Sequence, residues 1–359
     1  IYALIGAVFF LDFLNRYGVL PRAATWVPEL LSVLGVLVVA GVVGRTKSLK
    51  LPPMYWALGA FIVLHMGLGI VENHVQVGAV FSGIRAYFKF LPFFLLPIVY
   101  AYREEQIVRI LKVVLVVAVI QVPVALYQRF IQSAGMLTGD YVAGTIGTSS
   151  VLSIFLLCTI TTLLAFHMRG YLRAKSLAWI ALLLFVPTTI NETKGTVVLL
   201  PLALFVPLLV AGRAHAHARE WMGALLLGGA LLAAFIPTYD YFFGERHGIV
   251  EFYTSENALT RNLAPSLSGE YQREGKLDVV VAPFRELSKE PLKLLVGLGI
   301  GNVSESFLGS AFTGKYWSEY GLQMFLGVPP LLWEPEGLGL SLAAVRAVVV
   351  FDAALDHVA

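Results

Sequence analysis

Long apolar runs alternate with short polar connections along most of this chain. The runs lie near residues 1–14, 26–44, 52–71, 84–101, 106–127, 148–167, 176–190, 196–212 and 221–237. A helix that crosses about 30 Å of hydrocarbon needs about 20 mostly apolar residues, and these runs are close to that length. The sequence lacks the short alternating segments that are typical of a membrane β-barrel. The pattern therefore predicts membrane-spanning α-helices.

The end of the chain follows a different pattern. A long polar stretch occupies residues 238–316 and is rich in aromatic side chains, which favours a small ordered domain. Two apolar segments then close the chain, near 320–333 and 337–351. The first contains Pro329 and Pro330, and a double proline removes two backbone donors and kinks or ends a helix. This segment is therefore expected to be a broken span or a re-entrant hairpin.

These patterns together predict an all-α integral membrane protein, a polytopic bundle of ten or eleven transmembrane helices. Residues 1–237 would form helices one to nine. Residues 238–316 would form a long extracytoplasmic loop domain. Residues 317–359 would hold the broken or re-entrant segment and a closing helix. The run at Ile1–Leu14 is expected to be a first span and not a cleavable signal.

Composition agrees with a membrane protein. The chain of 359 residues is 58% hydrophobic and 14% charged, with a mean hydropathy of +0.77. A soluble domain is about 45–50% apolar and about 25% charged. The net charge of +3 is too small to indicate nucleic-acid binding. The single Cys158 allows no internal disulfide.

The distribution of Lys and Arg predicts the orientation, because cytoplasmic loops carry an excess of both. One set of alternating short connections is strongly basic: Arg45, Lys47, Lys50, Arg103, Arg109, Lys112, Arg169, Arg173, Lys175, Arg213 and Arg219. The other set holds fewer: Arg16, Arg22, Arg129 and Lys194. We place the first set in the cytoplasm. The connections at 72–83, 129–147 and 191–195, together with 238–316, would then lie outside.

Several charged residues remain on the predicted outer side against this bias. Arg85 and Lys89 are four residues apart in "GIRAYFKFLPFF", so they would share one face of a helix. Arg129 ends the fifth run, and Glu192 and Lys194 sit between two apolar runs. Such groups can be headgroup anchors or an exposed ion pair. Alternatively, charge within a membrane often marks a ligand site, and an Arg fork matches phosphate oxygens. An anionic ligand such as a lipid diphosphate is the functional interpretation.

Cofactor motifs are weak throughout the sequence. "GLGIG" at 297–301 predicts a close turn and not a dinucleotide site, because no strand–helix unit surrounds it. His215 and His217 lack the Cys or acidic residues that would complete a metal site. We therefore expect neither a metal nor a cofactor.

Four segments, in order, resemble the O-antigen ligase and O-antigen polymerase family. They are "GTIGTSSVLSIFLL" (144–157), "INETKGTVVLLPLAL" (190–204), "EPLKLLVGLGIGN" (290–302) and "LLWEPEGLGL" (331–340). The resemblance covers about residues 80–340 and rests mainly on order and topology. It implies a metal-independent glycosyltransferase that moves a glycan from undecaprenyl diphosphate to an acceptor. The reaction would occur on the periplasmic face of the bacterial inner membrane.

The resemblance also suggests site residues by position. Arg85 and Arg129 would hold the diphosphate, with Lys89, Lys194 and Arg273 assisting. The expected partners are an undecaprenyl diphosphate-linked oligosaccharide, membrane lipids and, for a polymer, chain-length and export proteins.

A general base could assist the acceptor hydroxyl. Glu192 is the first candidate, because it lies beside the predicted cations, and Asp240, Glu245 and His247, which follow the ninth run, are the reserves. The family's ligases are expected to carry a His in the outer helix before the Glu-x-Gly segment. Residues 303–333 contain none, which favours a polymerase over a ligase. The alternative class is a polysaccharide-related secondary transporter or flippase, which typically has mid-span charge and paired repeats with broken helices; a purely structural or partner-binding membrane protein is a third possibility.

Overall fold

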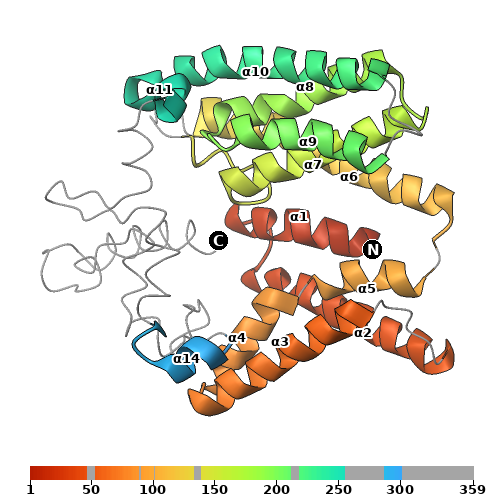
Figure 1. The fold of residues 1–359 in the computed structure, drawn as a ribbon, viewed down its shortest axis with the longest axis vertical. Coiled ribbons are helices and arrows are strands. Elements are labelled where there is room, and N and C mark those ends of the chain that lie inside the picture. The colour runs from red at the N-terminus through yellow and green to blue at the C-terminus, as the bar shows by residue number, and fades with distance from the viewer. Residues whose placement is uncertain are drawn as a thin grey trace, which may run out of the picture. The chain divides into compact units, whose positions relative to one another are not determined.

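The structure is a computed structural model that describes residues 1–46, 53–88, 90–100, 102–132, 139–211, 218–254 and 287–300. All the regular elements in these ranges are helices (Figure 1). The chain divides into two compact units. Within the described ranges, unit 1 comprises residues 1–25 and 103–254, and unit 2 comprises residues 26–102 and 287–300.

Five of the described helices are long and apolar enough to cross a membrane. They are Val27–Arg45, Pro53–Glu72, Glu104–Gln132, Ser149–Met168 and Ala218–Gly244. Two shorter apolar helices, Ala174–Ile190 and Thr196–Val210, accompany them. The helical class and the membrane-spanning character expected from the sequence agree with these elements. The total of ten or eleven spans stays a prediction.

Unit 1 is formed by the first helix and by the middle of the chain. Its elements are α1 (Tyr2–Arg16), α6 (Glu104–Tyr127), η2 (Gln128–Gln132), α7 (Ser149–Met168), α8 (Ala174–Ile190), α9 (Thr196–Ala211), α10 (Ala218–His247) and α11 (Ile249–Thr254), and η1 (Arg22–Trp26) lies at its boundary with unit 2. Most of these bounds fall within a few residues of the apolar runs, because a helix in hydrocarbon must satisfy its backbone internally.

The core of unit 1 lies where α7 packs on α8 and α9, and where α10 packs on the same two helices. On α7, Leu152, Leu156 and Ile160 are fully buried at a spacing of four residues. On α9 the residues Leu200, Leu204 and Leu208 repeat this spacing. Residues four apart lie on one face of a helix, so each of these rows forms one continuous apolar stripe.

Helix α10 is longer than the sequence indicated. Residue 237 was the expected end of the span, but the helix continues to His247. Phe235, Tyr239 and Phe243 are all buried, and their rings form a row with centroid separations of 5.6 Å and 5.0 Å. The four-residue spacing extends the buried face past Pro237, and it explains why the mixed aromatic and polar residues there remain helical.

Unit 2 contains α2 (Val27–Thr46), α3 (Pro53–Glu72), α4 (Val77–Phe88), α5 (Leu91–Val99) and α14 (Pro291–Val296). The single span expected near 84–101 is wrong, because α4 ends at Phe88 and α5 begins at Leu91. Pro92 lies in the first turn of α5, where its missing N–H leaves no hydrogen bond unmade. Helix α5 approaches α2 closely, since a Cβ on Gly35 would lie 2.7 Å from the Cβ of Pro92.

The end of α3 holds the turn after α14. Asn73 donates its side-chain N–H groups to the carbonyl oxygens of Gly69 at 2.9 Å and Gly297 at 3.0 Å. Gly297 and Gly299 have φ of +81° and +86°, which confirms the turn expected from "GLGIG". A Cβ on Gly299 would lie 2.7 Å from Val75 Cγ2, so a side chain there would strain both the backbone and the packing.

Several expectations fall on residues outside the described ranges. These include most of the proposed loop domain (255–286 and 301–316), all of 317–359, and the candidate residues Lys89 and Arg273. The predicted loop domain at 238–316 and the closing segment at 317–359 therefore stay predictions.

Candidate functional site

One end of unit 1 gathers polar side chains from four segments. These are η2, the 139–148 loop before α7, the 191–195 turn between α8 and α9, and the end of α10 with α11 (Figure 1). We call this the Arg129 end. The opposite end, called the basic end, carries most of the Lys and Arg of unit 1: Arg103, Arg109, Lys112, Arg169, Arg173, Lys175 and Arg219. Within unit 1, the connections rich in Lys and Arg therefore lie at one end, and the connections poor in Lys and Arg lie at the other end.

Arg129 is the most buried of the candidate cations whose surroundings are described. Its exposure is 9%, and it lies in the π-helical turn η2 at the end of α6. The guanidinium carbon is 5.0 Å from the ring centroids of both Phe242 and Phe243. A π-turn in a long helix frequently occurs at a functional site. The two rings offer cation–π stabilisation to a charge that would be costly in apolar surroundings.

Glu192 lies on the same side of unit 1 and interacts electrostatically with Arg129. Its Oε2 atom accepts a 2.9 Å hydrogen bond from the backbone N–H of Gly139. Glu192 also has φ of +59°, in the left-handed region that a non-glycine residue seldom occupies. Such a conformation costs on the order of 1–3 kcal/mol and is concentrated at functional sites. The structure therefore brings together Glu192 and Arg129, as the sequence predicted.

Gly139 is the point where the loop before α7 meets the turn after α8. A Cβ at this position would lie 2.7 Å from Phe243 Cζ and 2.8 Å from both Asn191 C and Glu192 N. These distances are shorter than real Cβ contacts, and two of the three atoms belong to the backbone. Only glycine therefore permits the observed approach of Glu192 to the loop.

Lys194 is covered by the short helix α11. Its Nζ atom lies 4.5 Å from the ring centroid of Phe252, and its carbonyl oxygen accepts a 2.9 Å hydrogen bond from the Tyr253 hydroxyl. Asp240 on α10 accepts a 2.7 Å hydrogen bond from Ile249 N–H, which fixes the start of α11. Burial raises the pKa of the Tyr253 hydroxyl. Asp240, a possible base by its position after the ninth run, thus has a structural role.

Two buried side-chain amides hold the loop and the turn. The Oε1 atom of Gln128 accepts from the N–H groups of Ala143 at 3.0 Å and Gly144 at 2.7 Å, and its Nε2 donates to Gly144 O at 2.9 Å. Asn191 donates to the Ser153 hydroxyl at 2.8 Å. Because these amides replace water for backbone groups that are buried, they fix the position of the residues that carry charge.

The Arg129 end also contains hydroxyls that are buried and have no hydrogen-bond partner among the described residues. They are those of Thr148, Thr193, Thr196 and Tyr239. Most buried polar groups in proteins are hydrogen-bonded, so a group of exceptions at one end of a unit calls for an explanation. Hydroxyls both donate and accept, as sugar and phosphate recognition requires.

The remaining candidates are described separately, because the structure assigns them no contact with this group. Arg85 belongs to unit 2, in the last turn of α4, where its Nε is 2.8 Å from Glu29 Oε1 and its guanidinium carbon is 4.6 Å from the Trp26 ring centroid. Glu29 therefore offsets its charge. Lys89 lies outside the described residues, so the expectation that it shares a helical face with Arg85 stays a prediction. His247 ends α10, and its side chain lies outside what the structure describes.

Comparison with protein families, with curated proteins and with solved structures finds no match for this chain. Sequence reasoning missed Gly139, Gln128 and the buried hydroxyls, because single Gly, Gln and Thr residues near apolar runs carry no distinctive pattern. Phe242 and Phe243 were visible only as part of an aromatic-rich stretch.

Proposed function

We propose that this protein is a lipid-linked glycosyltransferase, a polysaccharide polymerase in preference to a ligase, and that it works at the Arg129 end of unit 1. One observation carries the proposal: the nearly buried guanidinium of Arg129, stacked on Phe242 and Phe243 and acted on by Glu192. A charge of this kind at the end of an apolar helix is costly and usually functional. A lipid diphosphate presents its own charge at the same level, where spanning helices reach the headgroups.

The aromatic rings support diphosphate binding in particular. Both rings lie 5.0 Å from the guanidinium carbon and hold this group at the Arg129 end, and guanidinium donors match phosphate oxygens in bidentate geometry. Lys194 adds a second cation at the same end of the unit. The buried hydroxyls of Thr193 and Tyr239 supply polar groups for sugar or phosphate oxygens. These features together fit a ligand that is part phosphate and part glycan.

In the proposed reaction, a hydroxyl oxygen of the acceptor sugar attacks the anomeric carbon of the donor sugar. The bond between that carbon and the diphosphate oxygen breaks, and its electron pair leaves with the lipid diphosphate. The proton of the acceptor hydroxyl passes to the Glu192 carboxylate. Because negative charge grows on the leaving oxygen, Arg129 and Lys194 stabilise the transition state more than the ground state.

The family resemblance is the basis for three further parts of the proposal. The donor lipid is undecaprenyl diphosphate, the membrane is the bacterial inner membrane, and the reaction occurs on its extracytoplasmic side. The same resemblance supports a glycan acceptor and no metal or cofactor.

The test uses the full chain in nanodiscs with a lipid diphosphate-linked oligosaccharide and an acceptor, and it follows the release of lipid diphosphate. We expect Arg129→Ala to slow release by about 10²–10³, by analogy with the loss of an oxyanion donor. Lys175→Ala removes an exposed cation at the basic end and should leave the rate unchanged. If the wild type released no lipid diphosphate from intact substrate, transport or a different donor would be favoured instead.

A further inference from the structure

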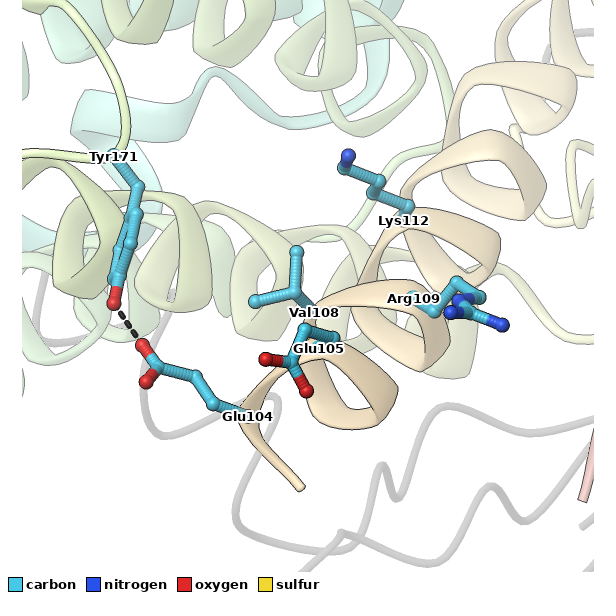
Figure 2. A pocket seen from close by; sticks show the side chains of 6 residues that line it. All are labelled: Glu104, Glu105, Val108, Arg109, Lys112 and Tyr171. Carbon is cyan, nitrogen blue, oxygen red and sulfur yellow. Dashed lines mark hydrogen bonds between the residues drawn. The ribbon is translucent and has the colours of Figure 1, made fainter. Parts of the chain in front are cut away.

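Two grooves meet at the basic end of unit 1. The first has a volume of ≈ 380 Å³ and is lined by Glu104, Glu105, Val108, Arg109, Lys112 and Tyr171 (Figure 2). The second has a volume of ≈ 260 Å³ and a mostly apolar lining from α6 and α7, including Leu111, Leu115, Leu163 and Phe166. Val108, Lys112 and Tyr171 line both grooves, so the polar groove continues into the apolar one.

The lining residues follow a definite order along α6. Glu104 and Glu105 form the first turn, Lys112 follows about 10 Å farther along the axis at 1.5 Å per residue, and the apolar groove reaches to Leu115. Figure 2 shows the two glutamates at the start of the helix, with Arg109 and Lys112 on the turns that follow. From the end of the helix inward, the groove is thus acidic, then basic, then apolar.

Three of these charged side chains have no ion-pair partner among the described residues. Glu105 and Arg109 are four residues apart, a spacing that permits an ion pair on a helix, yet neither they nor Lys112 forms one there. Glu104 differs, because it accepts a hydrogen bond from the Tyr171 hydroxyl (Figure 2). That contact joins α6 to the connection between α7 and α8 and closes one side of the groove. The other three charged side chains line the same groove, so its lining carries both signs.

We propose that this groove binds one molecule of an ethanolamine phospholipid. Such a lipid carries an ammonium group outermost, a phosphate beneath it and acyl chains below. Lys112 and Arg109 would hold the phosphate, Glu105 would accept hydrogen bonds from the ammonium, and one acyl chain would occupy the apolar groove. The order of the groups in the lipid is the order of the residues along α6.

The acidic residues decide which headgroup fits. An anionic headgroup without an amine would place negative charge beside Glu104 and Glu105, where like charges repel. A choline headgroup has no N–H to donate to Glu105. Basic pockets between membrane helices are typical sites for lipid headgroups, and the two glutamates make this one selective for the ethanolamine type.

This inference does not depend on the proposed function, because the groove and Arg129 lie at opposite ends of α6. Lipid binding here would tie the start of α6 to α7 and would leave the reaction chemistry untouched.

The test is native mass spectrometry of the full chain in detergent, with ethanolamine, glycerol and choline phospholipids of matched acyl chains. We expect the wild type to retain the ethanolamine lipid about threefold or more over the others, the scale of a partly screened charge contact. Glu105→Gln should remove this preference, whereas Lys112→Gln should lower the retention of all three lipids, because each of them carries the phosphate. Lys175→Gln, an exposed cation at the same end but outside the groove, should keep the preference.

A further variant tests the apolar groove alone. Thr162 lines the apolar groove, and Thr162→Trp would fill it without changing any charge. We expect lower retention of the ethanolamine lipid with an unchanged melting temperature. Equal retention of all three lipids by the wild type would overturn the proposal. So would a preference for the glycerol lipid, a preference for the ethanolamine lipid that survives Glu105→Gln, or unchanged retention of all three lipids by Lys112→Gln.

Discussion

The carboxylate of Glu192 and the backbone N–H of Gly139 form a 2.9 Å hydrogen bond across 53 positions of sequence. This bond joins the loop before α7 to the turn after α8, and both segments flank Arg129 at the end of α6. The same turn holds Glu192 at φ of +59°. The relationship fixes an acidic side chain that acts on Arg129, and four predictions follow from it and from the contacts around it.

Replacing Glu192 by Gln keeps a side-chain oxygen for Gly139 N–H and removes the negative charge. We expect the melting temperature to change little and glycosyl transfer to fall by about 10² or more, the usual contribution of a general base. Lipid diphosphate release in nanodiscs measures the rate. Glu251→Gln, an exposed acid on α11, is the matched control and should retain activity. Wild-type rates for Glu192→Gln would exclude this residue as the base.

Gly139→Ala should destabilise the Arg129 end. The new Cβ would meet Phe243 Cζ at 2.7 Å and backbone atoms of the 191–192 segment at 2.8 Å, so the loop must move. We expect the free energy of unfolding to fall by about 1–3 kcal/mol, the usual range for overpacking. Thermal melting in detergent measures it. Gly229→Ala in α10 is the control, because its Cβ would meet nothing within 4 Å; equal melting temperatures for the two variants would contradict the argument.

Gln128→Leu should loosen the loop that follows η2. The substitution leaves the N–H groups of Ala143 and Gly144 and the carbonyl of Gly144 without their side-chain partner. Each buried group left unpaired costs about 1–3 kcal/mol, so the effect should exceed that of Gln132→Leu at an exposed position. Amide hydrogen exchange of residues 139–148 reports it directly. Unchanged protection in Gln128→Leu would show that the amide does not hold the loop.

Stability should depend on pH through Tyr253 above about pH 10. Burial raises the pKa of this hydroxyl above its ordinary value of 10.0, so the unfolded chain loses the proton at a lower pH than the folded chain. The stabilisation is complete below the unfolded pKa and is lost as pH rises through the folded pKa. Melting temperatures between pH 9 and 11 should therefore fall less steeply for Tyr253→Phe. Tyr241→Phe, at a side chain that is 84% exposed, should keep the wild-type slope.

Most helix positions could be predicted from the sequence, and the exceptions have local causes. Each long apolar run predicts a helix, because in hydrocarbon the backbone N–H and C=O groups can form hydrogen bonds only with each other. The run near 84–101 failed because a second helix begins at Leu91 with Pro92 in its first turn, where the missing N–H is tolerated. The end of α10 was misplaced because Thr238, Asp240 and the charged residues after Gly244 interrupt the apolar pattern and hide the buried face that Tyr239 and Phe243 share.

The candidate site was predicted only in part. Glu192 and Arg129 were expected on one side of the membrane, because the connections at 129–147 and 191–195 belong to the same alternating set. The pairing of Arg85 with Glu29 was not expected, since 56 positions separate the two residues and neither lies in a distinctive motif.

The sequence by itself therefore determined the helical class, the apolar helices and the ends of unit 1 at which charged residues fall. The helices depend on local composition. The end at which a charged residue lies depends on the alternation of the connections, because successive helices run in opposite directions. Only the tertiary structure decided that Arg129 stacks on Phe242 and Phe243, that Gly139 holds Glu192, and that Lys112 joins a polar groove to an apolar one. Each of these contacts unites segments distant in the chain, and it exists only because packed helices bring their ends or their faces together.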